Sequence, residues 1–190
     1  MPFTLSAFSL PALVATIGIA VWAKRAARMR FLRRLWVGVV AGAAAIAAYD
    51  LLRWLILLVT PSDFNPFRAH RPFGALILST SPDTTSALVA GWTYHFWNGF
   101  AFAVMYTLLA GGARWWWGLG WAMTLESATI LVYPDAFGIS LRNWAFIGTS
   151  LAGHAAYGFT LGVLARQWLR EPPVRTTLTL ERPRLTAGLS

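Results

Sequence analysis

The sequence predicts an all-α fold, a polytopic transmembrane helical bundle of about five spans, with the N-terminus outside and the C-terminus inside. Three observations support this prediction. The chain has 190 residues, of which 57% are hydrophobic and only 12% are charged, about half the charge density of a soluble domain. Its apolar residues gather in stretches of about 20, which is the length that crosses a hydrocarbon core. Its basic residues collect outside these stretches, as in cytoplasmic loops.

The first two spans are predicted at residues 5–23 and 35–59. Basic residues follow the first span and none precedes it, which favours an uncleaved helix over a signal peptide. The second span begins with glycines and alanines that include Gly38-x-x-x-Gly42. Small residues let helix backbones approach closely, so this surface is predicted to pack tightly.

A proline-rich loop is predicted to follow, up to about Thr84. Within it, Phe73 to Leu78 is apolar but too short to span, which indicates a re-entrant or interfacial segment. The last three spans are predicted at residues 85–109, 115–133 and 144–165. Residues 1–168 thus form one bundle domain, and the charged, proline-containing tail at 169–190 is predicted to be cytoplasmic and poorly ordered.

The distribution of basic residues sets the predicted orientation. Three of them fall on the outer side, namely Arg68, Arg71 and Arg142. Twelve fall on the inner side: Lys24, Arg25, Arg28, Arg30, Arg33, Arg34, Arg114, Arg166, Arg170, Arg175, Arg182 and Arg184. This excess predicts that the side with twelve faces the cytoplasm.

Several function classes are excluded by composition and motifs. The net charge of +9 is accounted for by the basic loops of a membrane protein, so nucleic acid is not a predicted partner. The chain has no cysteine, which removes disulfides and thiolate chemistry. It has no phosphate-binding loop or dinucleotide fingerprint, and no Gly-x-Ser-x-Gly nucleophile motif.

Four ionisable residues lie inside predicted spans: Asp50, His95, Glu126 and His154. At 1.5 Å per residue, each lies roughly 10 to 15 Å below the outer end of its span. Such groups are rare in hydrocarbon and usually face a bundle interior or a watery cavity. We therefore predict that they converge on one polar site in the outer half of the membrane, where they serve as the catalytic or proton-binding groups.

Four polar residues at helical spacing are predicted to bind a ligand around this site: Arg53, Asn98, Tyr133 and Tyr157. Simpler interpretations stay open. Asp50 and Arg53 can neutralise each other, or Arg53 can reach the outer surface, and each histidine can be neutral and bonded to a carbonyl. Glu126 has no cation in its own span, so it must be protonated, partnered across helices or hydrated.

The third and fifth spans share a pattern that suggests a repeat. His95-Phe96-Trp97-Asn98-Gly99-Phe100 aligns with His154-Ala155-Ala156-Tyr157-Gly158-Phe159. Both spans run from outside to inside, so the repeat is parallel. The pattern predicts a histidine on one helix face and, one turn later, a glycine that admits a neighbouring helix.

The chain also resembles the YagU-like group of small bacterial inner-membrane proteins. The resemblance covers about residues 95 to 158 and runs through His95, Phe102-Ala103-Val104, Tyr106, Trp116, Gly118, Pro134, Asn143 and Gly153-His154. It implies a multi-pass protein of the bacterial inner (plasma) membrane and a link to acid or proton stress. It implies no catalytic residues.

Two function classes suit such a site best. Carboxylates and histidines in membranes relay protons or hold small ligands, which is the preferred function. The alternative is an intramembrane enzyme of isomerase or cyclase type that acts on a lipid or isoprenoid by acid–base chemistry. An accessory subunit of a membrane complex is also compatible with the sequence.

Partners and cofactors are less well defined by the sequence. Membrane lipids are the predicted partners, together with a homo-oligomer or a larger complex. No metal is predicted, because no two candidate ligands share a Glu-x-x-His or His-x-x-x-His spacing. The cofactor is unknown.

Overall fold

The computed structural model describes Gly18 and residues 24–60, 65–132 and 143–170. All regular elements in these ranges are helices, which confirms the all-α prediction. They are α2 (Arg25–Val59), the 3₁₀ helix η1 (Pro66–Ala69), α3 (His70–Leu78), α4 (Thr85–Leu109), α5 (Trp116–Val132) and α6 (Trp144–Leu169). The predicted span at residues 5–23, apart from Gly18, lies outside the described residues, as do Tyr133 and the tail from residue 171.

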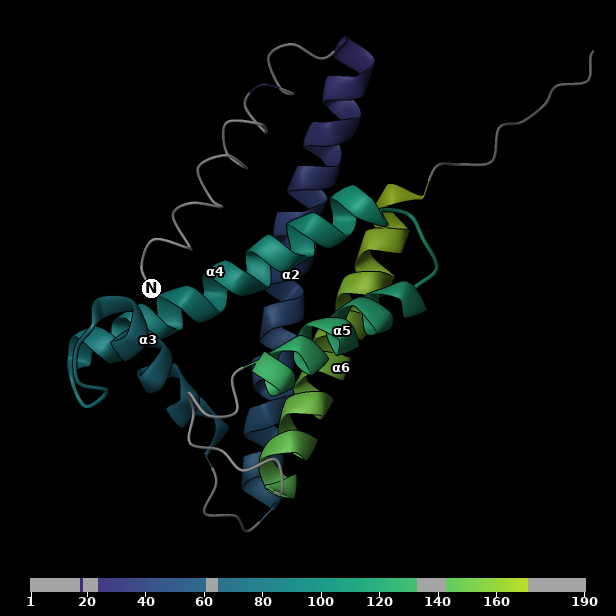
Figure 1. Cartoon of the computed structure of the whole chain (residues 1–190). Coiled ribbons are helices and arrows are strands. Elements are labelled where there is room, and N and C mark those ends of the chain that lie inside the picture. Colours follow the sequence, from purple (N-terminus) through teal and green to yellow (C-terminus); the bar gives the residue numbers. More distant parts are fainter. Residues whose placement is uncertain (1–17, 19–23, 61–64, 133–142, 171–190) are drawn as a thin grey trace, which may run out of the picture.

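The helices form two pairs, α2 with α4 and α5 with α6, which are joined through α2 and α6. α2 and α6 run side by side in opposite directions, α4 lies obliquely across α2, and α5 packs on α6 (Figure 1). The short helix α3 packs against α4. α4 and α5 do not form one of the main helix interfaces, so the region between them is free to hold a cavity.

Helix α2 begins at Arg25, well before the predicted span that starts at Leu35. Its first three turns were expected to be a basic loop, but arginine and leucine are good helix formers. Two arginines also gain hydrogen bonds in this position. Arg34 Nη1 donates to the carbonyl oxygen of Leu108 at 2.8 Å, and Arg33 donates to that of Trp168. These bonds satisfy carbonyls at the C-terminal ends of α4 and α6, which lack partners within their own helices.

The other boundaries follow local capping signals. Thr84 precedes α4, and its hydroxyl accepts a hydrogen bond from the backbone N–H of Ala87. Asn143 caps α6 in the same way, through Phe146 N–H. Such caps satisfy backbone donors that the first turn leaves free. The bounds of α4 agree with the predicted span at 85–109, and α6 begins where predicted but extends to Leu169.

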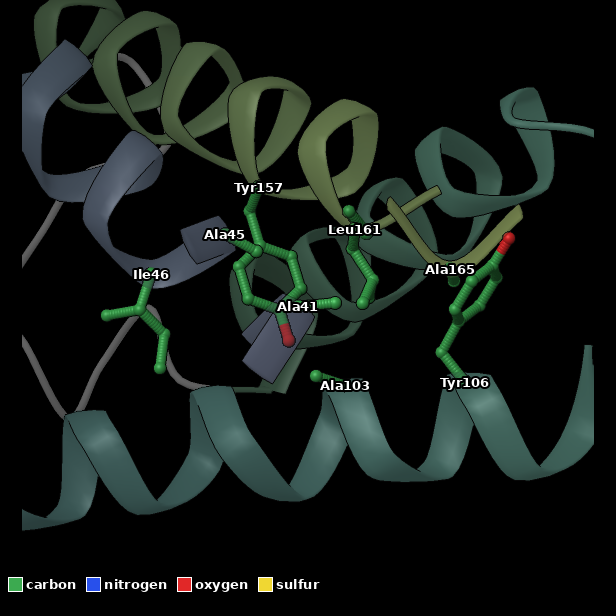
Figure 2. Packing of buried hydrophobic residues seen from close by; sticks show 9 residues of the cluster. Ala41, Ala45, Ile46, Ala103, Tyr106, Tyr157, Leu161 and Ala165 are labelled. Atoms are coloured by element: carbon green, nitrogen blue, oxygen red, sulfur yellow. The ribbon is translucent and has the colours of Figure 1, made fainter. Parts of the chain in front are cut away.

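The interior is built from small residues. Six of its fully buried side chains are alanines, and five of these pack with Tyr106, Tyr157 and Leu161 in one cluster between the helices (Figure 2). The tight-packing prediction for Gly38 and Gly42 is confirmed: a Cβ at Gly42 would lie 2.8 Å from Ala103 Cβ on α4, and one at Gly38 would lie 2.5 Å from Thr107 Oγ1.

Large apolar side chains, in contrast, point outward from all the longer helices. Leu58 is 62% exposed, Trp97 59% and Leu131 76%. By length and composition, one described helix, α2, is apolar enough to cross a membrane. α5 has only 17 residues, fewer than the roughly 20 that span a hydrocarbon core without distortion. The multi-pass arrangement and its orientation therefore stay predictions.

Candidate functional site

The four ionisable residues predicted to converge meet as two carboxylate–histidine pairs. His95 Nε2 on α4 lies 3.0 Å from Asp50 Oδ2 on α2. His154 Nδ1 on α6 lies 3.1 Å from Glu126 Oε2 on α5. The Asp50–His95 contact joins α2 to α4, and the Glu126–His154 contact joins α5 to α6. A histidine beside a carboxylate can accept or release a proton without leaving its partner, which is a common arrangement in proton relays.

Tyr49 connects the two pairs. Its ring lies 5.6 Å from the His95 ring and 5.0 Å from the His154 ring, the latter in an edge-on arrangement. Gly153 leaves room for it, because a Cβ there would lie 2.9 Å from the edge of the Tyr49 ring. Sequence analysis did not single out Tyr49. The available signal is its spacing of four residues from Arg53, which places both on one helix face.

Both histidines and Glu126 line one cavity of about 160 Å³. Tyr49, Arg53, Asn98 and Tyr157 also belong to its wall. Asp50 stands behind His95 and is not part of the wall. The cavity therefore collects residues of α2, α3, α4, α5 and α6, and its volume resembles that of an engineered cavity of about 150 Å³ that binds benzene.

Glu126 is almost fully buried, with 1% of its surface exposed. Neither carboxyl oxygen has a hydrogen-bond partner among the described residues. His154 Nδ1 lies 3.0 Å from the carbonyl oxygen of Ser150, and the geometry directs its N–H there rather than at Glu126. His154 therefore lies near Glu126 without a hydrogen bond to it, and the three situations predicted for Glu126 stay predictions.

Arg53 is buried, with 4% of its surface exposed, so the expectation that it could reach the outer surface is wrong. Its Nη2 donates to the carbonyl oxygen of Pro66 at 2.9 Å, and its guanidinium lies over the rings of Tyr49 and Phe67. Asp50 Oδ1 is 3.7 Å from Nη1, which is too long for a hydrogen bond. The Nε and Nη1 atoms have no hydrogen-bond partner among the described residues.

The other predicted ligand-binding residues have different positions. Asn98 lines the cavity from α4. The Tyr157 hydroxyl donates to the carbonyl oxygen of Gly99 at 2.6 Å, so this group joins α6 to α4 even though the ring lies in the wall. Tyr133 lies outside the described residues.

A third histidine, His70 on α3, was not predicted to belong to the site. Its ring lines the cavity 4.8 Å from the His95 ring, it is 4% exposed, and its Nε2 has no partner in the described part of the chain. Burial, helped by the nearby His95 and Arg53, lowers the pKa of His70 from 6.5 to about 3. This histidine is therefore neutral at physiological pH.

His70 reaches the cavity because α3 lies directly on α4. A Cβ at Gly91 would collide with the His70 backbone carbonyl, and one at Gly74 would collide with that of Ala87. The segment was predicted to be too short to span, and it is a nine-residue helix. Its position depends on the two glycines, and no local pattern in the sequence indicates that they meet.

In both helix pairs, the residues that meet recur at intervals of four along each helix. On α2 and α4, Asp50 meets His95. Successive steps of four residues, backward on α2 and forward on α4, bring together Ile46 with Gly99, Gly42 with Ala103, and Gly38 with Thr107. On α5 and α6, Glu126 meets His154, and the same steps bring together Ala122 with Gly158 and Gly118 with Gly162. The predicted role of the glycine in each repeat, to admit a neighbouring helix, is confirmed.

The described residues contain no group of three or more His, Asp or Glu side chains arranged to hold a metal ion. The wall of the cavity instead offers histidine nitrogens, one arginine and one buried carboxyl group. This set is suited to holding and moving protons and to binding a polar group that brings its own charge.

Comparison with known proteins gives one assignment. Residues 32–176 match the model of a family whose function is unknown, DUF6789. No curated protein and no solved structure matches the chain. The matched range contains both carboxylate–histidine pairs and His70, and the resemblance to YagU-like proteins stays a prediction.

Proposed function

The chain belongs to a family of unknown function (DUF6789), and we propose from its site that it is a multi-pass membrane protein that binds protons or a small ligand in its cavity. The membrane in question is the bacterial inner membrane, and the cavity would lie in its outer half. The observation that carries the proposal is the placement of two carboxylate–histidine pairs around one cavity.

Two features of the fold support the membrane assignment. Large apolar side chains face outward while alanines fill the interior. A soluble monomer rarely exposes so much apolar surface, whereas small residues at helix interfaces are typical of membrane bundles. In addition, the start of α2 and the ends of α4 and α6 meet through Arg33 and Arg34, so the basic residues of α2 and α6 gather at one end of the bundle.

Proton handling is supported by the contacts within the site. His95 and His154 each lie within about 3 Å of a carboxyl oxygen. The Tyr49 ring lies against the rings of both His95 and His154, and the cavity that they line is large enough for water. Water in the cavity could therefore carry a proton from one pair to the other.

Reconstitution in liposomes tests this function. Proton flux under an imposed potential, followed with an internal pH dye, should be lost in Glu126→Gln. Asp83→Asn, which removes an exposed carboxylate outside the cavity, is the matched control and should retain the flux. Equal flux in both variants, with both proteins folded, would refute a proton role for Glu126.

One observation favours the lipid or isoprenoid enzyme as the second candidate. Asn98 and Phe102 on α4, and Leu125 and Thr129 on α5, line the cavity and are half-exposed. A lipid chain could approach the site between these two helices. Absence of flux, combined with a lipid that co-purifies and is chemically converted by the wild type but not by Glu126→Gln, would favour this candidate over the first.

A further inference from the structure

We propose that the cavity binds a small carboxylate anion with an apolar body, held by Arg53 and His70, and that the anion binds together with a proton on His95. This inference rests on the proposed function and names the ligand class of the same site. The anion would bind at the end of the cavity where α2, α3 and α4 meet.

Unused hydrogen-bonding atoms identify the anion-binding groups. Arg53 is buried, yet its Nε and Nη1 have no hydrogen-bond partner among the described residues, although Nη1 lies 3.7 Å from Asp50 Oδ1. His70 is equally buried, and its Nε2 is also without a partner there. Both side chains line the cavity. Buried polar groups are almost always hydrogen-bonded, so unpaired donors on a cavity wall indicate a missing acceptor.

The chemistry of these groups favours a carboxylate as that acceptor. A guanidinium N–H donates a strong, charge-assisted hydrogen bond to a carboxylate oxygen, and because the free Nε and Nη1 lie on opposite edges of the group, the carboxylate would accept from one of them. His70, neutral and with its proton on Nε2, would donate a further hydrogen bond. Pro66 and the ring faces of Tyr49 and Phe67 already hold the rest of the guanidinium, so the group is fixed before any ligand arrives.

Charge balance explains the accompanying proton. The charged and titratable groups that face this end are Tyr49, Asp50 and Arg53 on α2, His70 on α3, Tyr94 and His95 on α4, Glu126 on α5 and His154 on α6. With His95 neutral and Glu126 protonated, Asp50 balances Arg53. When His95 takes up a proton, Asp50 pairs with it at 3.0 Å, and Arg53 is left without a counter-charge. An anion then restores neutrality, which a low-dielectric site strongly favours.

The aromatic residues in the rest of the cavity wall indicate that the part of the ligand beyond its carboxylate is apolar. Phe73, Tyr94, Phe102, Phe146 and Tyr157 surround the cavity with rings. Its volume, about 160 Å³, suits a body about the size of benzene. The carboxylate can come from a water-soluble acid or from the head of a fatty acid in the bilayer, and both sources share this chemistry.

The test measures benzoate binding to the full chain in lipid nanodiscs by calorimetry. We expect binding with uptake of about one proton per benzoate, obtained from buffers of different ionisation enthalpy. Benzamide, which has the same shape without the charge, should bind at least about tenfold more weakly, since hydrogen bonds to charged groups are the stronger ones. This comparison needs no variant and therefore holds even if Arg53 substitutions impair folding.

Substitutions then test whether Arg53 binds the carboxylate. Arg53→Gln should weaken benzoate at least about tenfold, and Arg53→Lys should restore part of the affinity. Arg71→Gln removes a half-buried arginine that lies outside the cavity and bonds Pro82, and should leave binding unchanged. Dodecanoate bound in an Arg53-dependent way, without benzoate binding, would support the proposal with the bilayer as the source.

Two results would overturn the proposal: equal binding of benzamide and benzoate, or no binding of either carboxylate. They are distinguishable from failure of the proposed function. Proton flux in liposomes that contain no carboxylate, lost in Glu126→Gln, would keep the proton role while the anion proposal falls. Arg53-dependent benzoate binding without any flux would keep the ligand site and remove the proton role.

Discussion

Replacement of Gly91 by alanine tests whether helix packing holds His70 in the site. A Cβ at Gly91 would collide with the carbonyl group of His70, which is backbone and cannot move aside alone. Alanine by itself favours a helix over glycine by about 1 kcal/mol. Overpacking in a tight interface costs about 1 to 3 kcal/mol, and a clash with backbone belongs at the upper end. We therefore expect Gly91→Ala to lower the free energy of unfolding by about 1 to 2 kcal/mol.

The matched control is Gly120→Ala on α5, where a Cβ would meet nothing within 4 Å. This variant should be more stable than wild type by up to about 1 kcal/mol. Unfolding in detergent by titration with SDS gives both values. Hydrogen exchange should also show faster exchange in α3 for Gly91→Ala alone. If both alanines stabilise the protein equally, α3 does not pack on α4 as described, and His70 is not a site residue.

Three further predictions follow from single contacts. Because His70 is neutral in the fold, the unfolded chain takes up a proton there between pH 6.5 and about 3. Stability should thus fall as the pH drops through this window, and the unfolding midpoint of His70→Asn should depend less on pH. Tyr157→Phe removes the bond to Gly99 and should cost about 1 kcal/mol in the same titration. Arg34→Gln removes the bond to Leu108 and should cost about 1 kcal/mol, whereas Arg30→Gln should change little.

Much of the site could be predicted because depth along a helix is a local property. Asp50, His95, Glu126 and His154 lie at similar distances from the ends of their helices, and helices that cross the same layer bring such residues to one level. The sequence alone does not show rotation about the helix axes. Asp50 forms an ion pair with Arg53 on its own helix, as the spacing allows, and its closer contact with His95 is a result of tertiary packing.

His70 and the start of α2 could not be predicted, for two different reasons. The position of His70 follows from the contact of Gly91 with its backbone, and two segments that meet in this way share no local pattern. Residues 25–34 read as a basic loop, because charge marks the edge of a membrane span. Their helical structure depends on carbonyl groups at the ends of α4 and α6 that accept hydrogen bonds from Arg33 and Arg34.

The common register of the two helix pairs has a mechanical consequence. Within a pair, glycines and alanines interlock at every turn, so sliding by a single residue, about 1.5 Å, would disturb all of these contacts together. The interface between the pairs, where α2 lies along α6, is just as tight, because a Cβ at Gly153 would lie 2.9 Å from the Tyr49 ring and 3.0 Å from Arg53 Cδ. The bundle therefore resists sliding at all three interfaces. The distances from Tyr49 to the His95 and His154 rings are set by this packing, so a proton that passes between the two pairs meets a fixed geometry.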